Sequence, residues 1–418
     1  MKLLIITNYF PPEIGAASHL FFELAESLVD AGVQVTVLTG FPRYNLRRRP
    51  PEYRHKWFMT ERVPTKSNGT ISVVRVGCTS IPFSRTIPFL RGLDHLWTAK
   101  VFLLRALALP RHDCTIIYSP PLTLGITARW LKLFKRTPFI VNVQDLFPQN
   151  AIDLGVLKNK ILIRLFQRME RYVYRHADLI TVHSDANKAH VQGLLPTDTG
   201  TVRTKVHTVP NWVDIEAIRP EPKRNAFTKR YNIPINKYIV SFAGVLGYSQ
   251  GTQIIVEAAQ LLHNEQDIHF IIVGEGPDRP HLEKLTVNSP NVSLLPLQPQ
   301  ETYPQVLAAS DLCLVTLKAS VKTPVVPSKI LSIMAAGRPI IASMPLNGDA
   351  PKLIKHAKAG VVLKPERADL LAQAILELSK NPELCKKYST NGRAYAETYL
   401  SRESIVKMYL ALFKTISP

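Results

Sequence analysis

The sequence predicts an α/β protein built from two doubly wound parallel-sheet domains. Strand patterns alternate with helix patterns twice along the chain, over residues 2–209 and again over residues 238–363. Between these runs, residues 210–214 (PNWVD) break the alternation ahead of the polar, proline-containing run 219–225. Alternating strands and helices favour a parallel sheet covered by helices, so each run predicts one such domain.

The first run opens with a strand, a loop, a helix and a second strand within residues 2–40. Leu20, Leu24 and Leu28 repeat every four residues along the helix, which suits a helix that covers a sheet. The loop carries Gly15-Ala16-Ala17 at the carboxyl end of the first strand, where such sheets bind ligands. Small residues let a ligand approach the backbone, although a plain connecting loop explains them equally well.

Asp145 follows a later strand of the first run, residues 139–143, at the same edge of the predicted sheet. A carboxylate at that edge suits chemistry, and it suits the capping of the next helix as well. Residues 41–95 are loop-rich, with one strand at 70–76. The other predicted elements are a helix at 93–109, a strand at 115–118, a loop and helix at 120–135, a helix at 158–176 and strands at 179–182 and 206–209, with Ser184 as a helix cap.

The second run repeats the alternation with glycine-rich turns at 244–251 and 274–276. We expect an N-terminal domain over residues 1–212, a second domain over residues 213–397, and a last helix at 398–418 that packs back on the first domain. The other predicted elements are strands at 238–243, 269–273, 292–295, 312–315 and 360–363, and helices at 252–264, 278–286, 303–309, 366–379, 382–397 and 401–415.

The stretch Thr323–Ser343 (TPVVPSKILSIMAAGRPIIAS) predicts an anion site in the second domain. Its apolar helix pattern begins near Ser328 and Lys329 and stops at Gly337. The N-terminus of a helix directs free N–H groups and a positive dipole end at the preceding loop, which suits a diphosphate. The alternative is an ordinary helix with a solvated lysine and a serine that only caps it.

The net charge of +20 is concentrated between Arg43 and Arg136, where 18 basic residues face 4 acidic ones. Aromatic and aliphatic residues are interleaved with these cations, which indicates attachment to an anionic membrane surface. A soluble protein with ordinary solvated helices is the alternative. The predicted membrane or acceptor face consists of Arg47, Arg48, Arg49, Trp57, Phe83, Phe89, Trp97, Arg105, Trp130, Lys132, Lys135 and Arg136.

Several classes of protein lack support in the sequence. No GxxxxGK[ST] loop indicates a nucleotide hydrolase, and no GxGxxG after the first strand indicates a nicotinamide enzyme. No D-x-D tripeptide or CxxC pair offers metal ligands, and no nucleic-acid module is recognisable. No signal peptide is visible and no uncharged apolar stretch reaches about 18 residues, so we expect a cytoplasmic protein without a spanning helix. We also expect no cofactor.

Nine segments carry a resemblance to a known family: YFPPEIGAA (9–17), VTVLTGFPRYN (35–45), YSPPLTLG (118–125), DLFPQNAIDLGVLKN (145–159), VPNWVD (209–214), FAGVLGYSQG (242–251), VGEGP (273–277), ASDLCLVTL (309–317) and VPSKILSIMAAGRPIIAS (326–343). In these segments the chain resembles the family-4 glycosyltransferases of the GT-B fold, which has two Rossmann-like domains facing a cleft. The likeness is strongest to the bacterial subgroup that includes fucosamine and colanic-acid sugar transferases.

The resemblance implies a retaining, metal-independent hexosyltransferase that takes a nucleotide diphosphate-sugar as donor, with the donor bound by the second domain and the acceptor by the first. It places Asp145 beside the reacting sugar and makes Lys329 the cation that stabilises the leaving diphosphate. The donor-binding residues that it implies, together with neighbours in the same loops, are Gly15, Ala16, Gly247, Tyr248, Gln250, Gly274, Leu295, Leu297, Gln298, Ser328 and Ser332.

Two departures from the family pattern affect charge. The family's pair of glutamates falls at Pro324 and Ser332, neither of which is acidic, and Tyr248 follows Gly247 where many members have a cation. Lys329, with Arg338, must then neutralise the diphosphate. With the basic face, these features predict a peripheral enzyme of the inner membrane face that glycosylates a polyprenyl-diphosphate-linked saccharide for exopolysaccharide or O-antigen synthesis. The alternatives are a nucleotide-sugar-binding pseudoenzyme, a nucleotide-sugar epimerase of the same fold and a nucleic-acid-binding protein.

Overall fold

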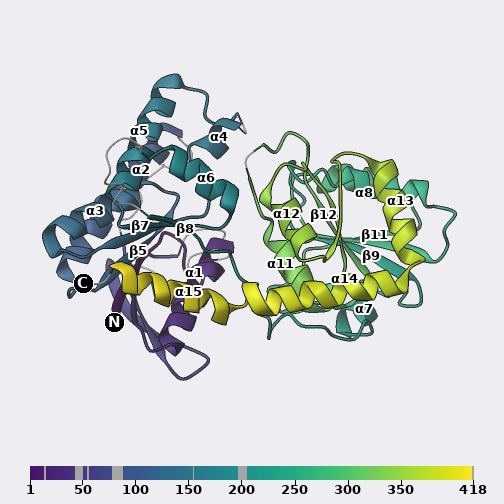
Figure 1. Ribbon diagram of the computed structural model, residues 1–418, viewed down its shortest axis with the longest axis horizontal. Coiled ribbons are helices and arrows are strands. Elements are labelled where there is room, and N and C mark those ends of the chain that lie inside the picture. The colour runs from purple at the N-terminus through teal and green to yellow at the C-terminus, as the bar shows by residue number, and fades with distance from the viewer. Residues whose placement is uncertain are drawn as a thin grey trace. The chain divides into compact units, whose positions relative to one another are not determined.

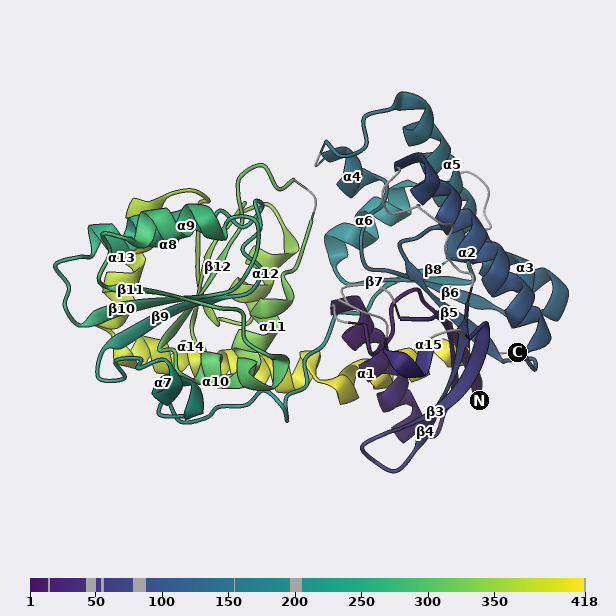
Figure 2. The same ribbon diagram turned by 180° about the vertical axis from the view of Figure 1, so that it is seen from behind.

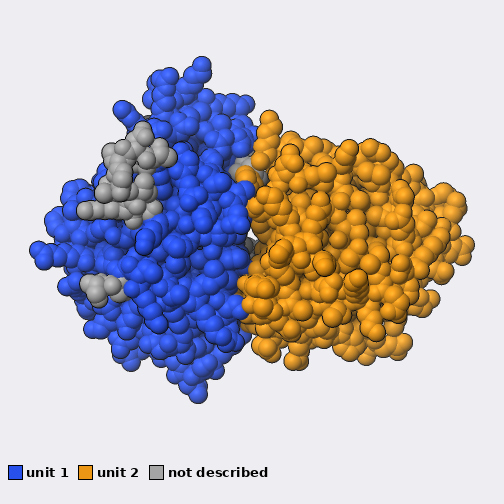
Figure 3. Space-filling model, viewed as in Figure 1, with its two compact units in different colours: residues 1–211, 402–418 blue, residues 212–401 orange. Residues whose placement is uncertain are grey.

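The two runs of alternating strands and helices build two separate units in the computed structural model. Unit 1 contains Met1–Asn211 and Arg402–Pro418, and unit 2 contains Trp212–Ser401 (Figures 1 and 3). The chain therefore crosses between the units twice, after Asn211 and before Arg402. The structure describes residues 1–13, 16–42, 50–53, 56–77, 88–153, 155–195, 205–322 and 324–416.

Unit 1 is organised around an eight-stranded sheet in the order β3-β4-β2-β1-β5-β6-β7-β8. All neighbouring strands are parallel except β3 and β4, which pair antiparallel at one edge. Because the first strand lies inside the sheet, with the next two parallel strands on one side and the later ones on the other, the topology reverses between β1 and β5. The strands are β1 (Lys2–Ile6), β2 (Gln34–Gly40), β3 (Phe58–Pro64), β4 (Thr70–Val76), β5 (Cys114–Ser119), β6 (Phe139–Val143), β7 (Leu179–Val182) and β8 (Lys205–Thr208).

Helices cover both faces of the unit 1 sheet, as expected for buried parallel strands. The core on one face joins Val141 and Val143 of β6 to residues of α2, α3 and α5, whereas α1 and α15 lie side by side on the other face (Figure 2). The helices are α1 (Ala16–Asp30), α2 (Pro88–Ala108), α3 (Thr123–Lys135), α4 (Gln149–Asp153), α5 (Lys160–His176), α6 (Asp185–Gly193) and α15 (Arg402–Ile416).

Most of the strands and helices predicted for this unit are confirmed, with shifted ends. Ser184 caps α6, because its side chain accepts a hydrogen bond from the Asn187 N–H. The prediction of a single strand in residues 41–95 was wrong, since β3 pairs along the whole of β4. In β3, Glu61 lies on the more buried side between Met59 and Val63, while Phe58 is exposed, and these two residues hid the alternation.

Polar contacts attach α15 to unit 1. Asn142 lies between Val141 and Val143, so its side chain points to the opposite face of the sheet, where it donates to the Tyr409 hydroxyl at 2.8 Å. Arg402, the first residue of α15, pairs with the buried carboxylate of Glu26 in α1. The C-terminal segment is therefore bound to unit 1 at both its start and its middle.

Unit 2 is organised around a six-stranded, wholly parallel sheet in the order β11-β10-β9-β12-β13-β14. Its first strand, β9, lies inside the sheet, and the chain winds first to one side of it and then to the other. The strands are β9 (Tyr238–Ala243), β10 (Ile268–Val273), β11 (Val292–Leu295), β12 (Leu312–Thr316), β13 (Ile340–Ser343) and β14 (Gly360–Leu363).

The helices of unit 2 form two layers over this sheet. One core joins Val240 and Phe242 to α8 and α13, and a second joins Cys313 and Val315 to α11 and α12. Two helices of unit 2, α7 and α12, were not predicted from the sequence. The helices are α7 (Ala226–Arg230), α8 (Gln253–Leu261), α9 (Arg279–Thr286), α10 (Tyr303–Ala308), α11 (Ser328–Ala335), α12 (Asp349–His356), α13 (Ala368–Ser379) and α14 (Pro382–Tyr395), the last continued by a π-helical turn (Ala396–Leu400).

The loops after β9 and β10 touch through their backbones. A Cβ placed on Gly274 would lie 2.1 Å from the Gly244 carbonyl oxygen, and one on Gly276 would lie 2.4 Å from the Leu246 carbonyl oxygen. Leu246 N–H donates to Glu275 O at 2.9 Å, which fixes one loop against the other. Glycine is therefore required here for close approach.

Among the described helices of both units, none is long and apolar enough to cross a membrane.

Tyr409→Phe should lower the free energy of unfolding by about 1 kcal/mol, because it removes the hydroxyl that accepts from the buried Asn142 amide. Urea unfolding measures this loss. Tyr172→Phe is the matched control, since Tyr172 is exposed on α5 in the same unit. Equal stability of the two variants would contradict a role for Tyr409 in attaching α15.

Gly274→Ala should destabilise the free protein by about 2 kcal/mol, because the added methyl group would displace a backbone carbonyl rather than a flexible side chain. Thermal unfolding without ligand checks the change. Gly247→Ala is the control within the facing loop, where the nearest atom to an added Cβ is 3.8 Å away, and it should leave stability unchanged. A tolerated Gly274→Ala would show that the two loops are not tightly joined.

Candidate functional site

A cavity of about 400 Å³ opens in unit 2 at the point where the sheet topology reverses. It lies beside the carboxyl end of β9, and on its other side is the segment that follows β12. Open α/β sheets bind ligands at this place, because the loops after the two strands diverge there. The lining residues are Ala243, Gly244, Val245, Gln250, Tyr303, Pro327, Ser328, Lys329 and Ser332.

Lys329 is the cationic group of this cavity. Its Nζ lies 3.8 Å from the centre of the Phe242 ring and 3.1 Å from Gln250 Oε1. Burial lowers the pKa of Lys329 to about 7, and no carboxylate in the described part of the chain offsets that effect. Near neutral pH the side chain is therefore divided between amine and ammonium, and an anion in the cavity would favour the ammonium.

The start of α11 brings backbone dipoles to the same place. Ser328 is the first residue of α11, Pro327 precedes it, and no side chain caps the helix. The N–H groups of a first helical turn lack acceptors within the helix and attract anions. The alternative of a solvated lysine beside a capping serine is thus wrong, since Lys329 is partly buried and Ser328 lies within the helix.

Gly244 forms the cavity wall opposite α11. Its φ of +146° belongs to a region that favours glycine, and a Cβ there would lie 3.1 Å from Lys329 Nζ. The backbone after β9 therefore passes close to the ammonium without an intervening side chain. On a third side, Tyr303 of α10 shares a hydrogen bond with Ser332 of α11, and burial raises the pKa of Tyr303.

The structure brings three of the predicted donor-binding residues, Gln250, Ser328 and Ser332, together with the predicted catalytic residue Lys329. The other described ones lie outside the cavity lining. Gly247 and Tyr248 lie in the same loop as Gln250, with Tyr248 exposed, and Gly274 packs against Gly244. Leu295 ends β11, Leu297 is exposed and Gln298 is bonded to the Tyr231 hydroxyl.

The glycine-rich turn 244–251 was predicted, although Gly244 and Val245 were not named singly as site residues, and the sequence did not indicate Tyr303 or Phe242. Phe242 has the pattern of a core strand residue, and it is fully buried, yet its ring face also holds the Lys329 amine. Nothing in the sequence near Tyr303 indicated a ligand site. The expectation that Arg338 faces the same anion was wrong, because its guanidinium donates to the carbonyls of Glu221 and Ala308.

In unit 1, Asp145 lies just beyond the carboxyl end of β6. The residue is exposed, yet the protein around its carboxyl raises its pKa by desolvation, and the nearby His183 partly offsets this shift. Asn150 of α4 donates to Asp145 Oδ1 at 3.4 Å. His183, which follows β7, was not predicted; its imidazole lies 2.9 Å from Asn187 Nδ2.

Several other predicted residues of unit 1 are not open to structural description. Gly15, Arg47, Arg48, Arg49 and Phe83 lie outside the described residues. Ala16 and Phe89 are placed only by their backbones, in the first turns of α1 and α2.

The predicted basic and aromatic face contains two kinds of residue. Trp57, Trp97 and Trp130 are exposed, and Trp130 stacks on Phe134 at 5.6 Å. Arg136 is also exposed, and Arg105 lies over the Phe58 ring. The other two described cations, Lys132 and Lys135, have polar partners within unit 1.

Lys132 pairs with Asp178, and Lys135 donates to the carbonyls of Ala106 and Leu109 at the end of α2. Burial lowers the pKa of Lys135. These two lysines therefore join α3 to neighbouring segments rather than point into solvent.

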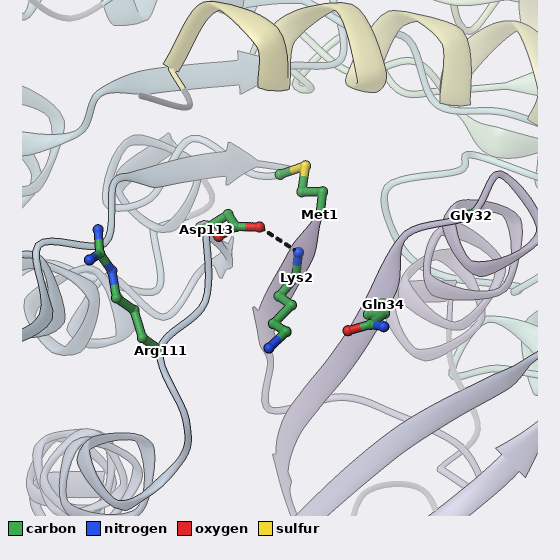
Figure 4. A pocket seen from close by; sticks show the side chains of 6 residues that line it. All are labelled: Met1, Lys2, Gly32, Gln34, Arg111 and Asp113. Atoms are coloured by element: carbon green, nitrogen blue, oxygen red, sulfur yellow. Dashed lines mark hydrogen bonds between the residues drawn. The ribbon is translucent and has the colours of Figure 1, made fainter.

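An open hollow of about 590 Å³, larger than the unit 2 cavity, lies in unit 1 (Figure 4). It is beside the amino end of β1, at the edge of the sheet opposite to the carboxyl ends of the parallel strands. Its lining includes Lys2, Arg111 and Asp113, and Asp113 Oδ2 accepts a hydrogen bond from the Lys2 N–H at 2.7 Å. The feature is shallow and lies away from the carboxyl ends of the strands. Within the described part of the chain, no three His, Cys, Asp or Glu side chains cluster as metal ligands would.

Two family models match the chain. The glycosyl transferase 4-like domain matches residues 15–212, and the glycosyl transferases group 1 domain matches residues 223–395. The Escherichia coli (strain K12) protein WcaI, assigned as a colanic acid biosynthesis glycosyl transferase, is 25% identical over 423 residues, covering 98% of this chain and 99% of its own.

Solved structures share the fold of the whole chain. Sucrose-phosphate synthase from Thermosynechococcus elongatus superposes with a TM-score of 0.72 at 16% identity, covering 100% of this chain and 99% of that one. Anabaena Alr3699/HepE in complex with UDP gives a TM-score of 0.69 at 17% identity, covering 99% of this chain and 100% of that one. The chain therefore belongs to the glycosyltransferases of the GT-B fold, with a glycosyl transferase 4-like domain followed by a group 1 domain.

Proposed function

We propose that the protein is a retaining glycosyltransferase that moves a sugar from a nucleotide diphosphate-sugar to a polyprenyl-diphosphate-linked saccharide in cell-surface polysaccharide synthesis. The observation that carries the proposal is the Lys329 amine, held in a cavity of unit 2 between a ring face and an uncapped helix. A lysine amine that is largely removed from water without a carboxylate partner is costly unless a ligand supplies the missing charge.

The donor diphosphate fits the chemistry of this cavity. Lys329 offers one ammonium, α11 offers amide dipoles, and Gly244 lets phosphate oxygens approach the backbone. HepE, which has the same fold, has been solved with UDP and with UDP-glucose. We therefore assign the diphosphate of a nucleotide sugar to this cavity, with Ser328 and Gln250 as further hydrogen-bonding groups.

The reaction needs charge stabilisation more than a covalent catalyst. The acceptor hydroxyl attacks the anomeric carbon from the side on which the diphosphate leaves, its oxygen forms the new glycosidic bond, and its proton passes to the departing phosphate oxygen. Retention of configuration follows from this same-side exchange. Negative charge develops on the diphosphate, and we propose that Lys329 and α11 stabilise it without a metal ion.

The lipid-linked acceptor is supported by the exposed aromatic side chains of unit 1. Trp97 on α2 and Trp130 on α3 present rings to solvent, and Lys100 Nζ lies 5.6 Å from the Trp97 ring centre. Tryptophan rings with nearby cations suit the headgroup region of an anionic bilayer. WcaI is assigned to colanic acid synthesis, so we propose a related surface polysaccharide as the product and the inner membrane face as the site of action.

One observation favours a binding protein without transferase activity. Ser332 occupies the position of a family glutamate, and its hydroxyl is already hydrogen-bonded to Tyr303. A hydroxyl so engaged binds a ribose more weakly than a carboxylate would. A measurement of turnover separates the two functions.

The direct test incubates the full chain with membranes and a panel of radiolabelled nucleotide sugars. Transfer of label into an organic-soluble product supports the proposal. Donor binding without any turnover would indicate the pseudoenzyme, and a changed sugar still attached to its nucleotide would indicate an epimerase. Salt-sensitive binding of DNA or RNA in place of donor would indicate a nucleic-acid protein.

Lys329 should take up a proton when donor binds at pH 8, because its pKa of about 7 rises beside a diphosphate. Affinity should fall as pH increases above about 7, by up to tenfold per pH unit. Calorimetry in buffers of different ionisation enthalpy measures the uptake. A nucleotide sugar serves as the probe, because its diphosphate has no terminal phosphate that titrates in this range.

Two variants complete this test. Lys329→Arg is permanently charged and should bind donor without proton uptake. Lys329→Met should weaken donor binding roughly tenfold to a hundredfold, the range expected for a lost charged hydrogen bond. Donor affinity within twofold of the wild type in Lys329→Met would remove Lys329 from the site.

Asp145→Asn should reduce turnover at least tenfold while changing donor affinity less than twofold, because we assign Asp145 to the reacting sugar rather than to the nucleotide. Steady-state kinetics and calorimetry together measure the difference. Asp153→Asn is the control, since Asp153 is an exposed residue of the nearby α4. Equal loss of turnover and donor binding in Asp145→Asn would assign Asp145 a structural role.

A further inference from the structure

The helix α5 in unit 1 exposes large aliphatic side chains on its outer face, which is unusual for a helix on the surface of a soluble protein. Its inner side is formed by Glu170, Val173 and Tyr174, which are buried. On the outer side, Ile161 is 75% exposed and Leu165 is 56% exposed, although both are large and aliphatic. The loop before α5 continues this pattern with Val156, which is 79% exposed.

The outer face is divided lengthwise into an apolar strip and a cationic strip. At about 100° per residue, Ile161, Leu165 and Tyr172 fall within roughly 40° of one another, with Leu162 beside them. Four exposed cations occupy the adjoining sector of roughly 80°: Lys160, Arg164, Arg168 and Arg171. Apolar and basic side chains therefore run in parallel along one exposed surface.

The exposed charged side chains of this segment are cationic. Residues 155–176 contain six Lys or Arg and a single acidic residue, Glu170, which lies on the buried side. Within the described residues, Lys160, Arg164 and Arg168 make no ion pair with a carboxylate. Their charges are therefore available to an external anion.

We propose that the outer face of α5, defined by Ile161, Leu162, Leu165, Lys160, Arg164 and Arg168, docks on an anionic lipid bilayer. The helix lies in the plane of the interface, its aliphatic strip enters the acyl boundary and its cations contact lipid phosphates. Aliphatic side chains do not stack on bases, so the strip favours lipid over nucleic acid. This surface was not part of the basic block between residues 43 and 136.

The helix α5 lies next to α3, which carries Trp130 of the predicted membrane or acceptor face. A Cβ on Gly125 of α3 would lie 2.3 Å from Val173 Cγ1 of α5, so the two helices are in close contact. Figures 1 and 2 both show α2, α3 and α5 along one side of unit 1. This inference rests on the proposed function, because docking on a bilayer would give the enzyme access to a lipid-linked acceptor. Lipid binding itself is measured without donor or acceptor, so it can be tested separately.

The experiment compares sedimentation of the full chain with vesicles of phosphatidylcholine alone and with vesicles that also contain phosphatidylglycerol. The wild type should favour the anionic vesicles at least tenfold. Ile161→Ser with Leu165→Ser should lower binding to anionic vesicles at least tenfold, and so should Lys160→Gln with Arg164→Gln and Arg168→Gln. All of these side chains are exposed, so donor affinity and thermal unfolding should stay unchanged.

Matched controls lie on unit 2. Leu261→Ser with Val287→Ser, and Lys380→Gln with Lys386→Gln and Lys387→Gln, change exposed side chains of the same kinds and should alter vesicle binding less than twofold. Unchanged binding in the α5 variants would overturn the proposal, and so would equal loss in the controls or displacement of the bound vesicles by RNA. Loss of transfer with normal vesicle binding would count only against the proposed function.

Discussion

The contact between the Lys329 amine and the Phe242 ring is the interaction on which the unit 2 site depends. It places a titratable cation between β9 and α11, with Gln250 as its polar partner and, among the described residues, no carboxylate to neutralise it. Such an arrangement is unfavourable in an empty cavity, because desolvation is not repaid by an ion pair. The proposed diphosphate would supply the negative charge that this arrangement lacks.

The topology of the sheet explains why this contact forms where it does. Reversal of the winding direction between β9 and β12 leaves a space at the carboxyl edge, and close packing of Gly274 on Gly244 fixes one wall of that space. Unit 1 repeats the same winding, with the reversal between β1 and β5. The last helix returns to unit 1 and is fastened there by Tyr409 and Arg402, so unit 1 is built from both ends of the chain.

Much of the fold was predictable, because buried parallel strands leave continuous apolar runs and Gly337 ends a periodic helix. The position of Ser328 and Lys329 at the start of a helix could also be predicted, because the beginning of a helix after a loop has a recognisable sequence pattern. Phe242 and Tyr303 could not, because a core residue and a ligand-lining residue have the same local sequence. The engagement of Lys135 and Arg338 with carbonyls was equally hidden, since spacing along the chain does not reveal long-range acceptors.

Lys329 has a depressed pKa in the unit 2 cavity, and we propose that it binds an anion there. Nuclear magnetic resonance of protein labelled with ¹³C-lysine tests it directly, with Lys329→Arg used to identify the Lys329 signal. The Lys329 signal should titrate near pH 7 in the free protein and at a higher pH once a nucleotide sugar is added. Titration near the ordinary lysine pKa of about 10.4, unchanged by the nucleotide sugar, would contradict the claim.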